Sequence, residues 1–243
     1  MMNRDQFLRA VLELRPKMVA FDCDGTLWDS DAGEGFFFWE LTQGCFPPEL
    51  AERMRKRYAE YKAGGVAEEV MCGEMVTMHA GMPVSRVREL ASEYFEGGFV
   101  TNIFAEMREL VLELQRAGSD VWAVSSSNEW VIQAAMPHFG IRPDHVLAAA
   151  VEVEDGKATD RLIRVPSGPG KGDAILEVVG RSPDAAFGNS QWDVEMLRMA
   201  QHAFAVNPRP ELEAVAESEG WPVYFPELIS QREAAIHAGR ALP

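Results

Sequence analysis

The feature that most constrains the fold is a series of short, largely apolar runs that alternate with stretches of helical periodicity. The runs lack the polar alternation of a half-exposed strand, so they predict strands buried on both faces. The expected strands are Met18–Phe21, Val121–Val124, Val146–Val151 and Ala185–Phe187, with weaker candidates at His202–Val206 and Pro222–Phe225. The expected helices are Asp5–Leu14, Ala105–Arg116, Glu129–Phe139, Lys171–Val179, Val194–Ala200 and Glu211–Ser218. This alternation predicts an α/β fold, a Rossmann-like parallel sheet with helices on both faces.

Two segments interrupt the alternation. The sequence VEVEDGKATDRLI alternates apolar and polar residues around Asp155-Gly156, which predicts a hairpin with a tight turn. Residues 30–101 contain helical patterns such as PELAERMRKRYAEYKAG, many aromatic and methionine residues, and no clear strand. We therefore expect a Rossmann-like core formed by residues 1–29 and 102–243, with residues 30–101 inserted as a helical cap domain.

Charge and cysteine content argue against several classes of protein. The 243 residues include 38 acidic ones and 23 lysines or arginines, which gives a formal net charge of −15 without the basic face of a nucleic-acid binder. The three cysteines lack CxxC spacing, which disfavours a disulfide framework or a structural zinc site. The N-terminal segment is charged throughout, and no apolar run approaches the roughly 18 residues of a membrane span. We expect a cytoplasmic protein without nucleic-acid or membrane partners; monomer and homodimer both stay open.

Polar residues suited to phosphate chemistry follow the expected strands, where ligands of a parallel α/β sheet bind. They are Asp22 and Asp24 after the first strand, Ser125 to Asn128 after the second, Asn189 and Asp193 after the fourth, and Lys171 at a helix start. Carboxylate and amide oxygens suit Mg²⁺, whereas hydroxyls, a lysine ammonium and helix N-termini suit a phosphate group. An aspartate can also act as a covalent nucleophile, with a second carboxylate as its proton shuttle.

Four motifs, in this order, resemble those of the haloacid dehalogenase superfamily. FDCDGTL at residues 21–27 is similar to the first motif in its phosphatase form, and VSSSN at 124–128 is similar to the second. Lys171 resembles the third motif, and FGNSQWDVEML at 187–197 resembles the fourth. The sequence at 205–225 looks like the phosphoserine-phosphatase-like branch, which carries a helical cap after the first motif. The resemblance extends over roughly residues 17–225.

The resemblance implies a role for each matching residue. Asp22 would attack phosphorus to form an aspartyl-phosphate, and Asp24 would protonate the leaving alcohol and then activate water. The residues that would hold the phosphoryl group are Thr26, Ser125, Ser126 and Lys171. The implied cofactor is Mg²⁺, held by Asp22, the backbone carbonyl of Asp24, Asn189 and Asp193. Asn189 departs from the commonest pattern, which has an acidic residue there, so one formal charge is missing from the implied metal site.

The reaction implied is hydrolysis of a small phosphate ester, such as phosphoserine or another amino-alcohol phosphate. Glu34 is a candidate contact for a substrate ammonium, and the aromatic run Phe36–Trp39 suits either a cation site or the core of the cap. Three alternatives stay open: a phosphotransferase, which would use the same residues, a dehalogenase of the same superfamily, which shares the first aspartate, and a non-catalytic binding module. A dehalogenase needs neither the acid Asp24 nor a metal, and the complete set of catalytic residues disfavours a binding module.

Overall fold

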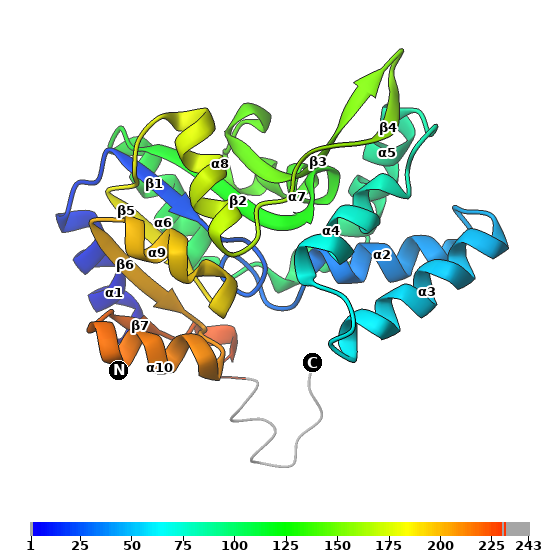
Figure 1. Cartoon of the computed structure of the whole chain (residues 1–243). Coiled ribbons are helices and arrows are strands. Elements are labelled where there is room, and N and C mark those ends of the chain that lie inside the picture. Colours follow the sequence, from blue (N-terminus) through cyan, green and yellow to red (C-terminus); the bar gives the residue numbers. More distant parts are fainter. Residues whose placement is uncertain (1, 230, 232–243) are drawn as a thin grey trace.

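In the computed structural model, which describes residues 2–229 and 231, a seven-stranded sheet forms the centre of the molecule (Figure 1). Its strand order is β4-β3-β2-β1-β5-β6-β7. The strands are β1 (Met18–Phe21), β2 (Asp120–Asn128), β3 (Val146–Glu154), β4 (Lys157–Arg164), β5 (Ala185–Gly188), β6 (His202–Val206) and β7 (Val223–Tyr224). Neighbouring strands are parallel except β3 and β4, which pair antiparallel as the predicted hairpin. The predicted α/β fold is therefore confirmed.

Strand β1 is buried on both faces because its side chains alternate between two apolar cores. Val19 and Phe21 belong to one core, and Met18 and Ala20 belong to the other. The first core is covered by α1 (Arg4–Glu13), α6 (Ala105–Arg116) and α7 (Glu129–Ala135). The second core is covered by α8 (Pro169–Val179), α9 (Val194–Met199) and α10 (Pro210–Glu219). The sheet thus has helices on both faces, as its uninterrupted apolar strands predict.

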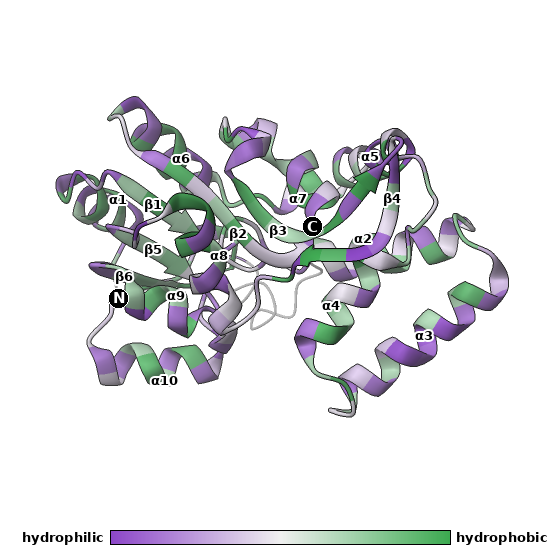
Figure 2. Cartoon of the chain, turned by 45° about the horizontal axis from the view of Figure 1, so that its top comes forward, coloured by the Kyte–Doolittle hydropathy of each residue, from purple (hydrophilic) through white to green (hydrophobic). Residues whose placement is uncertain are grey.

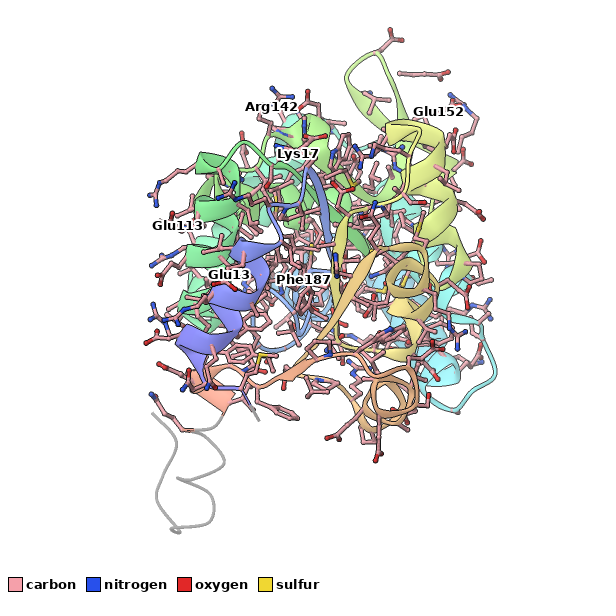
Figure 3. All side chains as sticks on the ribbon, turned by 90° about the vertical axis from the view of Figure 1, so that its left-hand side faces the viewer. Glu13, Lys17, Glu113, Arg142, Glu152 and Phe187 are labelled. Carbon is pink, nitrogen blue, oxygen red and sulfur yellow. The ribbon has the colours of Figure 1, made fainter. Side chains whose placement is uncertain are left out.

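Aromatic stacking joins the central strands within the first core. The ring of Phe187 stacks on Phe21 at a centroid distance of 4.3 Å and on Phe204 at 4.9 Å. Figure 3 shows Phe187 inside the molecule, whereas Glu13 and Arg142 lie at its surface. In Figure 2, β1 and β5 carry the hydrophobic colour, while α3 and α10 alternate between hydrophilic and hydrophobic residues. The residues that follow β1 and β5 are therefore carried by closely packed strands in the middle of the sheet.

The helix expected over residues 129–139 is divided in the structure, and that expectation is corrected. Helix α7 ends at Ala135, and a 3₁₀ turn covers Met136–Phe139. Pro137 lies at this junction, where it lacks the backbone N–H of an α-helix and its ring obstructs the preceding turn. Gly140, with a φ of +65°, then ends the segment. No helix of the described residues is both long enough and apolar enough to cross a membrane.

The part of the chain between β1 and α6 forms a group of helices at one end of the sheet (Figure 1). It contains α2 (Ala32–Gln43), α3 (Pro48–Lys62), α4 (Glu68–Thr77) and α5 (Val84–Glu96). The β3–β4 hairpin is joined to this cap by backbone hydrogen bonds, of which Gly81 N to Ala158 O is 2.8 Å and Val84 N to Gly156 O is 2.9 Å. The domain boundaries at residues 30 and 101 stay a prediction, and residues 230 and 232–243 of the predicted core lie outside the described residues.

Candidate active site

The loop after β1 is held against the loop after β5. The backbone N–H of Asp22 donates to the carbonyl of Phe187 at 2.9 Å, which continues the β1–β5 pairing by one residue. Gly25 then turns the chain with a φ of +80°, a conformation that favours glycine. A Cβ atom at Gly25 would lie 1.8 Å from Nδ2 of Asn189. The turn therefore needs a glycine both for its backbone conformation and for its close contact with Asn189.

A buried lysine joins two carboxylates at the centre of the site. The Nζ atom of Lys171 lies 2.6 Å from Oδ1 of Asp22 and 2.6 Å from Oδ1 of Asp193, and it donates to the Val124 carbonyl at 3.2 Å. The other oxygen of Asp22 accepts a hydrogen bond from the hydroxyl of Thr26 at 2.7 Å. Predicted to hold the phosphoryl group, Thr26 is fully buried in the structure and fixes the orientation of Asp22.

This group of two carboxylates and one ammonium carries a net negative charge inside the protein. Burial, followed by repulsion from Asp193, raises the pKa of Asp22 to about 7, and the Lys171 ammonium opposes that change. For Lys171, burial lowers the pKa, but attraction to Asp193 and Asp22 outweighs burial and holds the pKa above its ordinary value. Lys171 therefore stays charged and favours the ionised, nucleophilic form of Asp22.

Asp193 fixes the loop that follows β5. Its Oδ2 accepts hydrogen bonds from the backbone N–H of Asn189 and of Ser190, both at 2.9 Å, and from the Ser190 hydroxyl at 3.2 Å. With Oδ1 bound to Lys171, both oxygens of Asp193 are engaged. Asp193 itself is fully buried, whereas Asn189 lines the pocket. The structure thus gives Asp193 a positioning contact with the loop and with Lys171.

Asp24 lies in a different set of hydrogen bonds. Its Oδ1 accepts from the indole N–H of Trp28 at 2.9 Å and from the backbone N–H of Ala32 at 2.6 Å. Its Oδ2 accepts from the hydroxyl of Ser127 at 2.7 Å. Burial, followed by the nearby charge of Asp31, raises the pKa of Asp24 to about 7, although these hydrogen bonds oppose the change. A carboxyl group with such a pKa can hold a proton near neutral pH and release it, which general acid catalysis requires.

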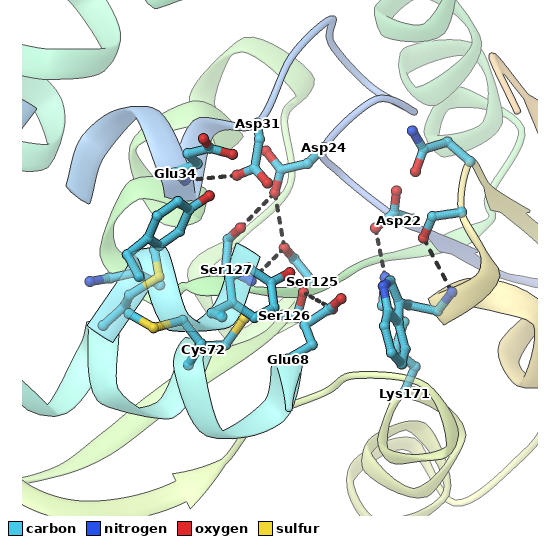
Figure 4. A pocket seen from close by; sticks show the side chains of 18 of the residues that line it. Asp22, Asp24, Asp31, Glu34, Glu68, Cys72, Ser125, Ser126, Ser127 and Lys171 are labelled. Atoms are coloured by element: carbon cyan, nitrogen blue, oxygen red, sulfur yellow. Dashed lines mark hydrogen bonds and ion pairs between the residues drawn. The ribbon is translucent and has the colours of Figure 1, made fainter. Parts of the chain in front are cut away.

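The serines after the apolar part of β2 lie in a bulge of that strand. Val124 pairs with Leu147 and Asn128 with Ala149, so the segment between them is longer on β2 than on β3. Bulges of this kind redirect side chains next to active sites. The hydroxyl of Ser125 lies 3.4 Å from Oδ2 of Asp24 and accepts from the backbone N–H of Ser127, whereas the hydroxyl of Ser126 points to the cap (Figure 4).

One pocket contains most of the predicted site residues. Those lining it are Asp22, Asp24, Glu34, Ser125, Ser126, Lys171 and Asn189. Thr26 and Asp193 lie behind this lining and contact Asp22 and Lys171. The sequence analysis did not single out several further lining residues, namely Asp31, Tyr58, Tyr61, Glu68 and Arg209. Ser127 was named among the polar residues after the second strand but was given no role of its own, and the structure shows it bound to Asp24.

The aromatic run of the cap does not form the wall of this pocket. Phe36 is fully buried in the core that the cap shares with the sheet, and Phe37 belongs to a separate apolar cluster of the cap. The cap aromatic residues that line the pocket are instead Tyr58 and Tyr61 of α3. Of the two uses that the sequence allowed for Phe36–Trp39, packing within the cap is the one consistent with these positions.

Comparison with known proteins identifies the family. A model of the family described as haloacid dehalogenase-like hydrolase matches residues 19–198, and the chain belongs to this family. The resemblance drawn from the four motifs is thereby confirmed. The chain is 32% identical over 165 residues to the protein named probable phosphatase Rv3661 of Mycobacterium tuberculosis (strain ATCC 25618 / H37Rv). That match covers 65% of this chain and 57% of the relative, so the chain spans little more than half of that protein.

A second relative and a solved structure match over more of their length. The protein named histidinol-phosphatase of Neisseria meningitidis serogroup C (strain 8013) is 25% identical over 217 residues, which are 85% of this chain and 97% of that one. The crystal structure of a protein of unknown function from Bordetella pertussis Tohama I has a TM-score of 0.73 and 22% identity. It covers 86% of this chain and 97% of its own, and this likeness shows the fold alone.

Proposed function

We propose that this protein is a Mg²⁺-dependent phosphomonoester hydrolase that acts on a small phosphorylated metabolite through an aspartyl-phosphate intermediate. The observation that carries the proposal is the setting of Asp22. Its carboxylate is buried and lines a pocket, held by Lys171 on one oxygen and by Thr26 on the other. A carboxylate fixed in this way is oriented for attack, and Lys171 can also attract a dianionic phosphate.

In the first step, a carboxylate oxygen of Asp22 forms a bond to phosphorus while the bond between phosphorus and the ester oxygen breaks. Asp24 gives its proton to the leaving alkoxide, which departs as an alcohol. In the second step, Asp24 takes a proton from water, whose oxygen attacks phosphorus and releases inorganic phosphate from Asp22. Ser125 and Ser126, which line the same pocket beside Lys171, are proposed to bind phosphate oxygens.

The donor atoms of the site suit Mg²⁺. Asp22, the backbone carbonyl of Asp24, and Asn189 offer oxygen donors, the type that this ion prefers, and Asp193, the fourth proposed ligand, also holds the loop of Asn189 in place. Within the described residues, no three His, Cys, Asp or Glu side chains are grouped as a metal site, so the proposed site depends on an amide and a backbone carbonyl beside the carboxylates. When bound, Mg²⁺ would neutralise charge on the phosphoryl group and so assist attack by an anionic carboxylate.

The substrate class that we propose is an amino-alcohol phosphate, of which phosphoserine is one example. Glu34 lines the pocket and remains the predicted ammonium contact from the sequence. The name of the Neisseria relative supports the same class, because histidinol is an amino alcohol. Several acidic side chains of the cap wall, Asp31, Glu34 and Glu68, also favour a substrate with a positive charge.

The proposal is tested by phosphate release from a panel of esters, with Mg²⁺ and with EDTA. The panel contains phosphoserine, phosphoethanolamine, phosphocholine, histidinol phosphate, sugar phosphates and p-nitrophenyl phosphate. We expect metal-dependent release from at least one ester and a loss of roughly 10³-fold or more in Asp22→Asn, because the nucleophile is removed. Capture of beryllofluoride by the wild type but not by Asp22→Asn would support the intermediate. Full activity of Asp22→Asn, or no release from any ester, would exclude the mechanism.

A further inference from the structure

Glu68, the first residue of α4, reaches from the cap to the core side of the pocket. Its Oε1 accepts hydrogen bonds from the hydroxyl of Ser167 at 2.9 Å and from that of Ser126 at 3.3 Å. Ser126 follows the apolar part of β2, and Ser167 belongs to the loop that leads into the helix of Lys171. One carboxylate of the cap therefore touches both loops that flank the proposed phosphate site, and Figure 4 shows its contact with Ser126.

The second oxygen of this carboxylate is available to a ligand. In the described part of the chain, Oε2 of Glu68 accepts no hydrogen bond, and no basic side chain there forms an ion pair with Glu68. Burial raises the pKa of Glu68 above its ordinary range, while the hydrogen bond from Ser167 and the charge of Lys171 oppose that rise. A partly buried carboxylate without a directly paired counter-charge is costly, and a cation that enters the pocket beside it would lower that cost. This setting points to a positively charged group on the ligand.

The side chains on the same face of α4 as Glu68 indicate what surrounds the positively charged group of the ligand. Met71, Cys72 and Met75 are spaced from Glu68 by three, four and seven residues, so all lie on one side of the helix and line the pocket. Thioether and thiol side chains adapt to uncharged organic groups and carry no positive charge to pair with a carboxylate. Beyond Glu68, the cap wall thus suits an uncharged part of the substrate.

Each basic side chain that lines the pocket already faces an acidic group of the protein. Among the described lining residues, these are Lys62, Lys171 and Arg209. Lys171 is held by two aspartates, and Lys62 pairs with Glu34 at 3.4 Å. Arg209 is an exposed residue beside the loop of Asn189, and its charge opposes the rise in the pKa of Asp31 on the cap side. A substrate carboxylate would therefore compete with an acidic group of the protein for any of these cations.

We propose that Glu68 binds the ammonium group of the substrate, which is the phosphate monoester of a small amino alcohol without a carboxylate. Because Ser126 bonds Glu68 and lies beside Ser125, the nitrogen would be close to the phosphate, on the carbon next to the one that carries the ester oxygen. This inference rests on the proposed function, since it places the phosphate at the Lys171 end of the pocket. It adds a recognition residue from α4 to the predicted contact Glu34.

The test compares phosphoethanolamine with 2-hydroxyethyl phosphate, which replaces the ammonium by a neutral hydroxyl, and with phosphoserine. Glu68→Gln removes the charge but keeps an oxygen that accepts from Ser126 and Ser167, so the contact between cap and core is retained. We expect kcat/KM for phosphoethanolamine to fall roughly 10–100-fold in this variant, mainly through KM, because a hydrogen bond to a charged group is lost. The value for 2-hydroxyethyl phosphate should change less than about 3-fold. Glu69→Gln, an exposed neighbour on the same turn, is the matched control.

An equal loss on both esters would assign Glu68 to cap positioning and overturn the proposal, as would a wild-type preference for phosphoserine over phosphoethanolamine. Binding is measured separately by calorimetry in the Asp22→Asn background, where turnover is not needed. In that background, adding Glu68→Gln should weaken the binding of phosphoethanolamine at least 10-fold and leave the binding of 2-hydroxyethyl phosphate unchanged. If no ester is hydrolysed but this difference in binding is found, the proposed reaction fails and the ammonium site stands. If the difference is absent, the ammonium site fails whatever the reaction.

Discussion

The pocket has a core wall, which includes Asp22 and Lys171, and a cap wall, which includes Glu34 and Lys62, and the two differ in how deeply their charged side chains are buried. In the core wall, the Lys171 and Asp22 side chains are 2% and 7% exposed, and their ion pair is 2.6 Å long. In the cap wall, the side chains of Lys62 and Glu34 are 56% and 36% exposed, and their ion pair is 3.4 Å long. Buried charges at short distance hold one geometry, whereas exposed pairs are screened by water and contribute little. The core wall therefore suits the chemical step, and the cap wall suits the choice of substrate.

After the nucleophile Asp22, the largest effect on turnover is expected at Asp24 in the core wall. Asp24→Asn removes the group that we assign as general acid and base, so kcat should fall roughly 10²–10⁴-fold. The hydrogen bonds can persist, because the amide oxygen can accept from Trp28 and Ala32 while the amide nitrogen donates to Ser127. Steady-state phosphate release on the best ester measures the loss. A fall of less than 3-fold would remove Asp24 from the mechanism.

The same variant is expected to change how the free energy of unfolding depends on pH, when it is measured in EDTA without metal. The pKa of Asp24 is about 7 in the folded state and 3.8 as a model group, so the folded protein binds more protons between these values. This group therefore lowers the free energy of unfolding as pH rises from about 4 to about 7. Asp24→Asn does not lose stability in this way. Its free energy of unfolding should therefore exceed that of the wild type by roughly 1–2 kcal/mol at pH 8, and by less at pH 5. An equal gain at both pH values would contradict burial of an ionisable Asp24.

The next effect concerns the balance of buried charge. Lys171→Met leaves Asp22 and Asp193 close together without their shared counter-charge, a change that costs about 3–5 kcal/mol in buried ion pairs. Thermal unfolding should show a Tm lower by roughly 10 °C. The double variant Lys171→Met with Asp193→Asn should recover part of the loss, since it removes one of the two carboxylates. A Tm within 2 °C of the wild type would show that the core wall does not depend on this ammonium.

Much of the core wall could be predicted because it depends on local sequence. Met18–Phe21 is apolar at every position, which indicates a strand buried on both faces, and the residues that end such strands gather at one edge of the sheet. The break of the helix at Pro137 was also predictable from the missing N–H of proline, although the apolar spacing concealed it. The catalytic and metal-binding roles of these residues stay predictions, because positions alone do not demonstrate chemistry.

The cap wall was less predictable because it depends on docking between distant segments. Nothing in the sequence GGVAEEV separates Glu68 from Glu69, yet Glu68 meets Ser126, 58 residues away, and Ser167, 99 residues away. The run Phe36–Trp39 gave an ambiguous pattern for a related reason. Phe36 and Phe37 lie in different apolar clusters, so α2 shows no single hydrophobic face that periodicity could reveal.

The smallest effect is expected at Glu34. It tests whether Glu34 and Glu68, both in the cap wall, contribute equally to binding the substrate ammonium. Glu34 pairs with the exposed Lys62, whose ammonium also lies 5.3 Å from the ring centre of Tyr58, so a solvated partner already meets part of its charge. Glu34→Gln should therefore change stability by less than about 1 kcal/mol and lower kcat/KM for phosphoethanolamine less than Glu68→Gln does. Lys62→Met serves as the control that breaks the same pair from the other side. If Glu34→Gln lowers kcat/KM as much as Glu68→Gln while Lys62→Met does not, Glu34 is the principal ammonium contact, and recognition lies near the rim of the pocket rather than beside the phosphate.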